Sequence, residues 1–344
     1  MSDALVFVSC ADSGELHVLR LSADGQLRTV QVLALGGQLM PMALSPDQTR
    51  LYVARRSDPL AVVALAADAA AGSLSVLCES PLPASMASLS TDHSGRWLFS
   101  ASYGADIVAV QALDAGGHAA TAAVHPTGRH AHCVLADPTN RFVLATSLGG
   151  DQLHRYHFDA ASGRLTGMTS PVFPMPAGTG PRHLCFNQRG DRVYVLGELD
   201  ACVHVLSFDL ATGALALLQT LTTLPPGFAG KAWGADLHLT SDGRWLYTSE
   251  RNSHTLAGHA VDGRTGLLSP IGHWPTQATP RGFAITPDGR FLLAAGQTSH
   301  QVGVHAIDSA SGELVLVAEH ATGLNPNWVV VLSEPPHRNE KDTN

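Results

Sequence analysis

The sequence has few charged residues and no segment suited to crossing a membrane. Only 15% of its 344 residues are charged and 45% are hydrophobic, a balance typical of a globular protein with a buried core. No apolar stretch reaches about 18 residues, the length of a membrane span. The start MSDALVFVSC has no basic segment followed by a long apolar run. We therefore expect neither a transmembrane helix nor a signal peptide.

Positive charge is scarce. The chain has 21 Lys and Arg against 29 Asp and Glu, which gives a formal net charge of −8. An acidic protein is repelled by nucleic acid and by anionic membrane surfaces. We expect neither of them as a partner.

Cysteine is too sparse and scattered for a disulfide framework or a zinc site. The five cysteines form no CxxC pair; they are Cys10, Cys78, Cys133, Cys185 and Cys202. An odd number without paired spacing is typical of reduced thiols. We predict a cytoplasmic protein with no metal site.

Motifs of several enzyme classes are also missing. There is no GxSxG elbow, no P-loop and no GxGxxG that opens a helix, so nucleotide-binding and serine-hydrolase interpretations lack support. His130 and His132 lie two apart in RHAHC, but no carboxylate at clear spacing accompanies them, and a metal is not favoured. The histidines within alternating segments are interpreted as structural or solvated: His154, His157, His204, His238, His259 and His305.

The most informative feature present is an internal repeat. A turn, an arginine and a β-rich run recur as SPDQTRLYVA, TDHSGRWLFSAS, DPTNRFVLATS, NQRGDRVYVLGE, TSDGRWLYTSE and TPDGRFLLAAG. The arginines follow one another at about 45 to 52 residues, the period of a propeller blade. They are Arg50, Arg96, Arg141, Arg192, Arg244 and Arg290.

A second repeat element indicates how the ring closes. The second element is an alternating strand, a polar turn and a glycine, and it follows each arginine element, as in QLHRYHFDAASGRL and CVHVLSFDLATGAL. The second element occurs seven times, whereas the arginine element occurs six times. ALVFVSC at the start and NPNWVVVLS at the end are interpreted as the missing second and first strands of one blade. Such a blade closes the ring and covers the sheet edges.

These repeats predict an all-β fold, a seven-bladed β-propeller of four-stranded blades. Two β-sandwiches are the alternative, but they do not explain seven matched units. We predict one domain over residues 1–333 and a disordered polar tail over residues 334–344.

Polar residues fall at matched places in these repeats. Counting back eight residues from each turn glycine, or its equivalent, gives Met40 or Pro41, Ala87, His132, Arg182, Ala235 and Arg281, and the last strand adds Asn327. Counting forward eight gives Arg56, Tyr103, Leu148, Glu198, Arg251 and Gln297. The first two strands of a blade form an antiparallel hairpin, so both sets are expected at one mouth of the propeller.

We expect the charged residues of both sets to converge on an axial pocket. His132 and Arg281 belong to blades on either side of the blade that holds Arg182 and Glu198. Paired guanidinium groups suit a carboxylate or phosphate ligand. The alternative is a salt bridge between Arg182 and Glu198 that only stabilises a hairpin. Asp236, one residue beyond the matched offset, is either a second pocket carboxylate or a strand-start cap.

At these residues the sequence resembles the lactonase family of seven-bladed propellers. The segments that carry the resemblance include HAHCVLADP, GPRHLCFNQRGDRVYVLGEL, WGADLHLTSDGRWLYTSER and PRGFAITPDGRFLLAAGQ, and they span nearly the whole chain. The family includes bacterial 6-phosphogluconolactonases and fungal 3-carboxymuconate lactonizing enzymes, and the resemblance is closer to the first branch. Many members have Asp-Leu-Gly where this chain has Ser147-Leu148-Gly149, which leaves the substrate open.

The resemblance implies hydrolysis of a sugar-acid lactone, such as 6-phosphoglucono-δ-lactone, without a cofactor. It assigns catalysis to His132, Arg182, Glu198 and Arg281, with Glu198 or His132 as the base. Substrate-binding candidates are Arg251, Asp236, Gln297, Tyr103 and His183. The expected partner is a small anionic lactone, and the expected state is a monomer or weak homo-oligomer. The alternatives are lactonization of a muconate-like diacid and a non-catalytic scaffold.

Overall fold

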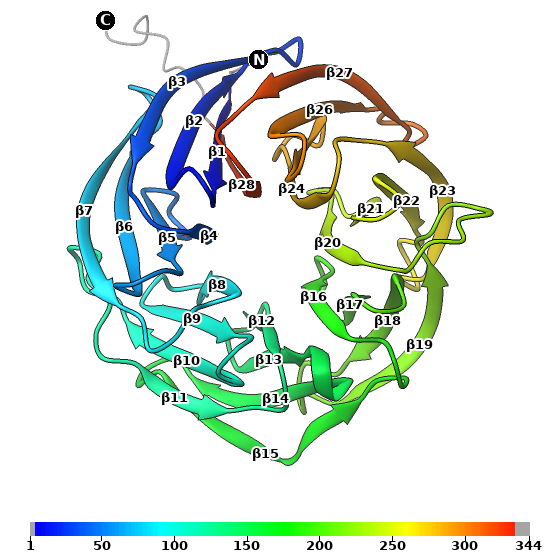
Figure 1. Cartoon of the computed structure of the whole chain (residues 1–344). Helices are drawn as coiled ribbons and strands as arrows, with labels where there is room; N and C mark the ends of the chain where they lie inside the picture. The colour runs from blue at the N-terminus through cyan, green and yellow to red at the C-terminus, as the bar shows by residue number, and fades with distance from the viewer. Residues whose placement is uncertain (1–3, 334–344) are drawn as a thin grey trace, which may run out of the picture.

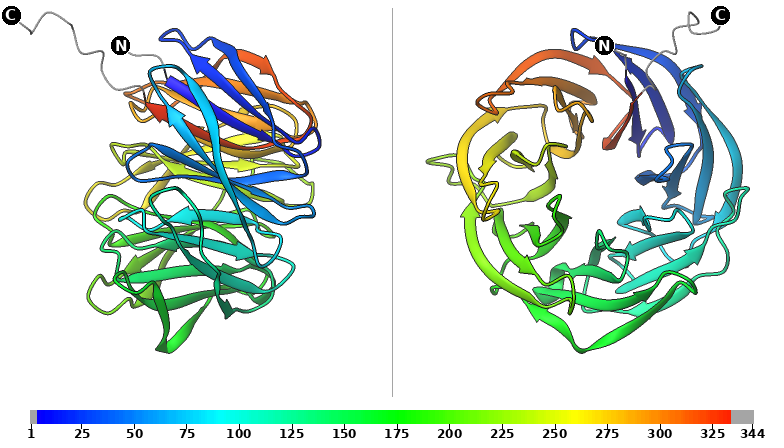
Figure 2. Two further views of the ribbon diagram at one scale, coloured as in Figure 1. Left: turned by 90° about the vertical axis from the view of Figure 1, so that its left-hand side faces the viewer. Right: turned by 180° about the vertical axis from the view of Figure 1, so that it is seen from behind.

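Residues 4–333, the part of the chain that this computed structural model describes, form seven four-stranded antiparallel sheets arranged as a ring (Figure 1). The view from behind shows the same ring (Figure 2). The predicted seven-bladed β-propeller is therefore confirmed. The predicted tail, 334–344, lies outside the described residues.

Each blade places its four strands in order from the axis to the rim (Figure 1). The innermost strands are β4 (Leu39–Leu44), β8 (Ser88–Thr91), β12 (Ala131–Ala136), β16 (Pro181–Phe186), β20 (Gly234–Leu239), β24 (Pro280–Ile285) and β28 (Pro326–Ser333). The second strands are β5 (Arg50–Arg55), β9 (Trp97–Ser102), β13 (Phe142–Ser147), β17 (Arg192–Gly197), β21 (Trp245–Glu250), β25 (Phe291–Gly296) and β1 (Ala4–Cys10).

The outer half of each blade completes the sheet. The third strands are β6 (Ala61–Asp68), β10 (Ile107–Ala112), β14 (Gln152–Asp159), β18 (Cys202–Phe208), β22 (Thr255–Val261), β26 (Gln301–Ile307) and β2 (Glu15–Leu21). The outermost strands are β7 (Ser73–Pro81), β11 (Ala123–Pro126), β15 (Arg164–Pro174), β19 (Leu215–Thr222), β23 (Leu268–Pro275), β27 (Leu314–Ala321) and β3 (Leu27–Ala34). A short 3-10 helix, η1, spans Leu148–Gly150.

The two ends of the described chain share one blade. β28 pairs antiparallel with β1, from Ala4 opposite Ser333 to Ser9 opposite Trp328. β28 also contacts β4 and β24, the innermost strands of the neighbouring blades. The predicted closure by the first and last strands is therefore confirmed, and it removes two exposed sheet edges.

The blades pack face to face through apolar side chains. Every residue of β13 and of β25 is buried, because the second strands are covered on both sides by neighbouring blades. The outermost strands instead alternate between exposed and partly buried residues, as in β19. None of the helical residues between positions 4 and 333 forms a segment long and apolar enough to span a membrane.

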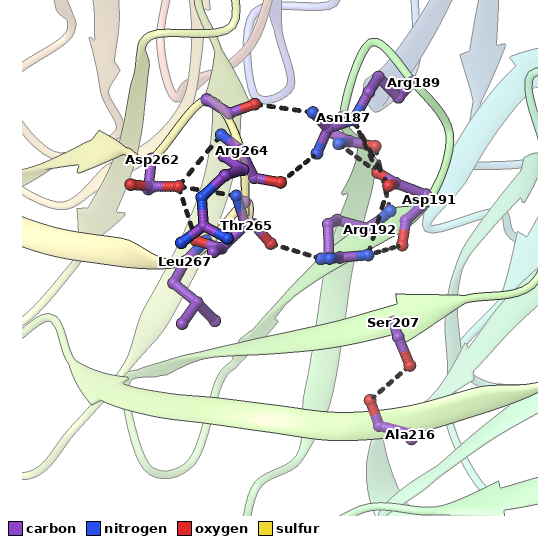
Figure 3. A network of polar contacts seen from close by, with 12 residues as sticks. Asn187, Arg189, Asp191, Arg192, Ser207, Ala216, Asp262, Arg264, Thr265 and Leu267 are labelled. Atoms are coloured by element: carbon purple, nitrogen blue, oxygen red, sulfur yellow. Dashed lines mark hydrogen bonds and ion pairs between the residues drawn. The ribbon is translucent and has the colours of Figure 1, made fainter.

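The repeated arginines join each blade to the next. Arg192 Nε donates to the carbonyl oxygen of Thr265 at 2.7 Å, in the turn between the third and fourth strands of the following blade (Figure 3). The other five make the same kind of contact, in the pairs Arg50 with Ala115, Arg96 with Ala160, Arg141 with Leu210, Arg244 with Ser309 and Arg290 with Ala23. The repeat therefore encodes hydrogen bonds between blades.

The turn before each arginine requires a left-handed residue. Gly190 has φ 73° and Gly243 has φ 70°, values that glycine adopts without steric cost. Gln48 and Asn140 hold the same turn position with φ 58° and 59° in the two blades that lack the glycine. The sequence alignment of the blades on this position is thus supported by their backbone geometry.

Candidate functional site at the propeller axis

A β-bulge interrupts the innermost strands where the polar residues occur. The register with the second strand shifts between Ala131 and Val134 in β12 and between Pro181 and His183 in β16. The same shift lies between Gly234 and Leu237 in β20 and between Pro280 and Gly282 in β24. A bulge redirects the side chain of the extra residue. The bulged residues include His132, Arg182, Asp236 and Arg281.

Arg182 and Glu198 form the centre of the site. Arg182 is 1% exposed, and its Nε donates to Glu198 Oε2 at 2.9 Å. Nη1 of Arg182 donates to the carbonyl oxygen of Ala235 in the next blade. Its Nη2 is buried and has no hydrogen-bond partner within residues 4–333. One donor of this guanidinium is therefore left for a ligand.

Arg251 is the second partner of Glu198. Its Nη2 donates to Glu198 Oε2 at 2.8 Å and to the Gly234 carbonyl oxygen at 2.8 Å. Its guanidinium carbon lies 3.9 Å from the ring centroid of Trp233. Burial and then the charge of Arg182 lower the pKa of Arg251 to about 10, while Glu198 opposes the shift.

Glu198 is held ionised by this arrangement. Its burial raises the pKa of the carboxyl, but the charges of Arg182 and Arg251 outweigh burial and lower that pKa below its ordinary value. A carboxylate that accepts from two guanidinium groups is a weak proton acceptor. We interpret Glu198 as the anchor of the two arginines.

Arg281 lies beside this group without a counterion. Within residues 4–333 its side chain makes no hydrogen bond or ion pair, and its Nε is buried without a partner. Burial holds the pKa of Arg281 well below its ordinary value, and the charges of Arg182 and Arg251 lower it further. The charge of Arg56 also lowers the pKa of Arg281, whereas the charge of Glu198 raises it. Arg182 and Arg251 thus share Glu198, whereas Arg281 has no ion-pair partner in the described chain.

His132 lies next to these arginines and to two aromatic rings. Its side chain is buried, and its ring centroid lies 5.1 Å from that of His183 and 6.3 Å from that of Tyr103. Burial, followed by the charge of Arg182, holds the pKa of His132 well below its ordinary value. The imidazole is therefore neutral near pH 7. Its Nδ1 is buried and unpartnered within the described chain.

His183 is paired with Asp236 across two blades. His183 Nδ1 lies 2.6 Å from Asp236 Oδ1, and both side chains are buried. The same carboxylate accepts from the backbone N–H of Leu237 and of Phe283, and His238 Nε2 lies 3.2 Å from Oδ2. Asp236 thus contacts His183 and His238 as well as the backbone of its own strand, and its role in substrate binding stays a prediction.

We name this group of residues the axial cluster. Its members are His132, Arg182, His183, Glu198, Asp236, Arg251 and Arg281. Buried polar atoms without a partner in the described chain mark the places where a ligand or water would bond. The cluster contains four of them: His132 Nδ1, Arg182 Nη2, His183 Nε2 and Arg281 Nε.

Two predicted substrate-binding residues lie at the margin of the cluster. The ring of Tyr103 stacks on His130 at 4.1 Å, and the hydroxyphenyl side chain remains 36% exposed. Gln297 Nε2 donates to Asn325 Oδ1 at 2.7 Å. The contacts of Gln297 therefore secure the loop before β28, and a role in substrate binding stays a prediction.

The segment that departs from the family pattern has a structural role. Ser147 is buried, and its Oγ donates to the carbonyl oxygen of Arg129 at 2.8 Å. Four residues later, the Asp151 carboxylate accepts from the backbone N–H of Gly178 and of Gly180, each at 2.7 Å. Asp151 therefore positions the loop that leads into β16 and Arg182.

His154 and His204, two of the histidines interpreted as structural, make local hydrogen bonds. His154 Nε2 accepts from the backbone N–H of Gly128 at 2.9 Å, and His204 pairs with Asp200 at 3.1 Å. His238 is different, because its partner is Asp236 of the cluster. Within residues 4–333, no three His, Cys, Asp or Glu side chains are grouped so that they could hold a metal ion.

Sequence reasoning assigned no catalytic or binding role to two contributors to the site, of which it placed Arg56 at the axial pocket and missed Trp233. Arg56 was at the matched forward offset, but nothing in the sequence showed that its charge acts on Arg281. Trp233 precedes β20 in the segment WGAD, and only the fold places its ring against Arg251. The matched offset was the usable signal for Arg56, whereas Trp233 had none.

Fold and site together define a seven-bladed propeller with a cationic, partly unsatisfied cluster at its axis. The sequence profile of the family described as "Lactonase, 7-bladed beta-propeller" matches residues 5–331. The chain belongs to this family.

Individual relatives cover nearly all of the chain. A 6-phosphogluconolactonase of Serratia proteamaculans is 37% identical over 331 residues, which are 96% of this chain and 99% of the relative. A 6-phosphogluconolactonase of Pectobacterium carotovorum is 38% identical over 96% of this chain and 98% of its own. The structure of a periplasmic gluconolactonase of Pseudomonas aeruginosa has a TM-score of 0.90 and 29% identity, and the match covers 97% of this chain and 100% of the other.

Proposed function

We propose that this protein hydrolyses 6-phosphoglucono-δ-lactone to 6-phosphogluconate at the axial cluster. The observation that carries the proposal is the excess of buried guanidinium groups over carboxylates near Glu198. Family membership and the relatives named above support a lactone substrate. The cluster adds a preference for an anionic one.

The charge balance of the cluster favours an anion. Arg182 and Arg251 share Glu198, whereas Arg281 has no counterion within the described residues. A buried cation without a counterion is costly, and a bound anion removes that cost. A phosphate or carboxylate matches the fork of a guanidinium. We assign the phosphate of the substrate to Arg281 and the donors around it.

The reaction is transfer of the lactone acyl group to water. Water adds to the lactone carbonyl carbon as its proton passes to a base, and the carbonyl oxygen takes the negative charge. The ring C–O bond then breaks, and the proton returns to the leaving ring oxygen. The free Nη2 of Arg182 is a suitable donor to the developing oxyanion. A δ-lactone also opens in water without help, so the cluster needs no covalent nucleophile.

The sequence left Glu198 and His132 as alternative bases, and the geometry favours His132. Glu198 Oε2 already accepts from two arginines. His132 is neutral because burial and the charge of Arg182 hold its pKa well below the ordinary value. A neutral imidazole has a lone pair for the proton of the attacking water.

The test is hydrolysis of freshly generated 6-phosphoglucono-δ-lactone at slightly acidic pH, where the spontaneous background is low. Unphosphorylated gluconolactone is assayed in parallel. We expect the wild type to prefer the phosphorylated substrate and Arg182→Gln to lose at least about 100-fold in kcat/KM. Arg155→Gln is the matched control, because Arg155 is also buried but donates to Gly213 in the rim of the ring.

Each outcome separates one part of the proposal. Equal rates on both lactones would remove the phosphate assignment and leave a general sugar lactonase. Absence of turnover above background on either lactone would overturn the proposed function, and muconate-type diacids would be the next substrates. Equal losses in the Arg155 and Arg182 variants would indicate a folding defect, which circular dichroism would also show.

We further propose a cytoplasmic, monomeric or weakly associating protein. All five cysteines are free thiols in the structure, which suits a reducing compartment. Cell fractionation and size-exclusion chromatography with light scattering test the two statements. A periplasmic protein or a stable oligomer would contradict them.

A further inference from the structure

The Asp236 carboxylate fixes the tautomer of His183. Asp236 is ionised: burial raises its pKa, but the neighbouring His238 and His183 and their hydrogen bonds hold that pKa well below the ordinary value. An ionised carboxylate only accepts hydrogen bonds. The contact of 2.6 Å therefore requires a proton on His183 Nδ1. In neutral His183, the lone pair is then on Nε2.

The ring of His183, which carries an unpartnered nitrogen, lies next to the ring of His132. His183 Nε2 and His132 Nδ1 are both buried, and neither has a hydrogen-bond partner within residues 4–333. The two ring centroids lie 5.1 Å apart, with an angle of 54° between the planes. An N–H···N hydrogen bond between two imidazoles, with nitrogens about 2.9 Å apart, gives a centroid separation of about 5 Å. The observed centroid separation is therefore compatible with such a bond, although the two nitrogens are unpartnered in the described chain.

We propose that Asp236, His183 and His132 form a hydrogen-bonded chain, which we call the relay, in which His132 is the catalytic base of the hydrolysis and His183 and Asp236 are positioning residues that take up no proton. His183 Nε2 accepts from His132 Nδ1, so the lone pair of neutral His132 is on Nε2. That nitrogen takes the proton of the attacking water. Catalytic hydrogen bonds often tighten only when substrate is bound, and we expect the bond between His132 and His183 to form in that state.

The relay offsets an unfavourable environment for a base. His132 becomes an imidazolium beside Arg182, Arg251 and Arg281, whose charges oppose the new charge. A hydrogen bond to His183, backed by the Asp236 carboxylate, stabilises that imidazolium. The proton count balances, because the proton that His132 takes from water returns to the ring oxygen. Negative charge on the bound substrate further compensates the arginines.

This inference rests on the proposed lactonase function, and a double-mutant cycle tests it. His132→Gln and His183→Gln are assayed singly and together on 6-phosphoglucono-δ-lactone. We expect each single variant to lose about 100-fold or more in kcat with little change in KM. We expect the double variant to lose no more than His132→Gln alone, because residues that act as one unit are not additive.

The control for His183 is another buried histidine of the same blade. His204 pairs with Asp200 at 3.1 Å, and its other nitrogen contacts Thr220 at 3.0 Å. His204→Gln therefore removes a buried His–Asp pair without removing a free nitrogen. We expect it to change stability but not the kcat of the folded enzyme. A kcat loss equal to that of His183→Gln would show that the effect of His183 is structural.

Nitrogen NMR of histidine-labelled protein gives a readout independent of activity. We expect the Nδ1–H tautomer for both His183 and His132, and we expect Asp236→Asn to weaken this preference. An Nε2–H tautomer for His132 would overturn the relay even in an active enzyme. So would multiplied losses in the double variant or a wild-type kcat in His183→Gln. An inactive wild type would instead overturn the proposed function, and the relay with it.

Discussion

Glu198 Oε2 lies 2.9 Å from Arg182 Nε, and this ion pair joins the start of β16 to the residue that follows β17. The pair does more than secure a hairpin, because the same oxygen accepts from Arg251 of the next blade at 2.8 Å. Glu198 thus fixes the direction of two guanidinium groups and leaves Arg182 Nη2 free.

Replacement of Glu198 by Gln should affect binding more than chemistry. The neutral amide cannot hold two cations in place, so Arg182 and Arg251 lose their orientation. We expect KM for the phosphorylated lactone to rise by about 10-fold or more, with kcat reduced less, by analogy with other charged hydrogen bonds. As pH is lowered, kcat/KM of the variant should begin to fall at the same pH as in the wild type. A selective loss of kcat, together with disappearance of this fall at acidic pH, would identify Glu198 as the base.

Removal of the Arg281 charge should stabilise the fold while reducing activity. A buried guanidinium next to two other cations is repelled by them and has no counterion within the described residues. Arg281→Met keeps much of the side-chain volume and removes the charge. We expect Tm to rise by about 2 °C or more, and KM for the phosphorylated lactone to rise while that for gluconolactone stays unchanged. Calorimetry and steady-state kinetics measure both; a lower Tm would contradict the charge argument.

The pH dependence of kcat/KM should report a base with a lowered pKa. Burial, and then the charges of Arg182, His183, Arg281 and Arg251, hold the pKa of His132 well below 6.5. A base must be unprotonated, so activity is lost only as pH falls through that lowered pKa. We expect kcat/KM to be constant from pH 7.5 down to 6.5 and to fall at more acidic pH.

As pH is lowered, kcat should begin to fall at a higher pH than kcat/KM does. Bound substrate adds negative charge near the arginines and thereby favours the imidazolium of His132. Initial rates over the same pH range give both profiles. The assignment of His132 would be contradicted if kcat and kcat/KM fell at the same pH, or if kcat/KM already fell at pH 7.

Trp233 should affect substrate binding through Arg251. The guanidinium carbon lies 3.9 Å from the ring centroid, and the indole is 37% exposed. A cation–π contact contributes about 0.5 to 2 kcal/mol. We expect Trp233→Leu to raise KM by about 2-fold to 30-fold with kcat nearly unchanged, and Arg251→Lys to behave similarly. If Trp233→Leu left KM unchanged, stacking on the ring would not be needed to position Arg251.

Arg192 should contribute to stability without contributing to catalysis. Its Nε donates to the Thr265 carbonyl oxygen of the next blade, on the face opposite to the bulged residues. We expect Arg192→Ala to lower the free energy of unfolding by about 1 to 3 kcal/mol. Arg189→Ala is a control on the same surface, because Arg189 donates to the carbonyl oxygens of Gly263 and Arg264 (Figure 3). The side chain of Arg189 is 47% exposed. We expect a smaller loss there, and unchanged kcat/KM in both variants.

The sequence by itself determined the architecture and the positions from which the site is built. The two repeat elements together indicated seven blades, because the turn, the arginine and the strand that follows it are encoded within about a dozen residues. Matched offsets selected His132, Arg182, Glu198 and Arg281, since equivalent strand positions face the same way in every blade.

Only the tertiary structure decided which of these side chains meet. Arg251 reaches Glu198, and Asp236 reaches His183, from the neighbouring blade, 53 residues away in each case. These contacts depend on bulges and on the angle between adjacent sheets, which strand periodicity does not specify. Strand periodicity also does not specify that Arg281 has no counterion within the described residues. Spacing along a strand is a local property, whereas burial and pairing at the axis arise only when the blades close into a ring.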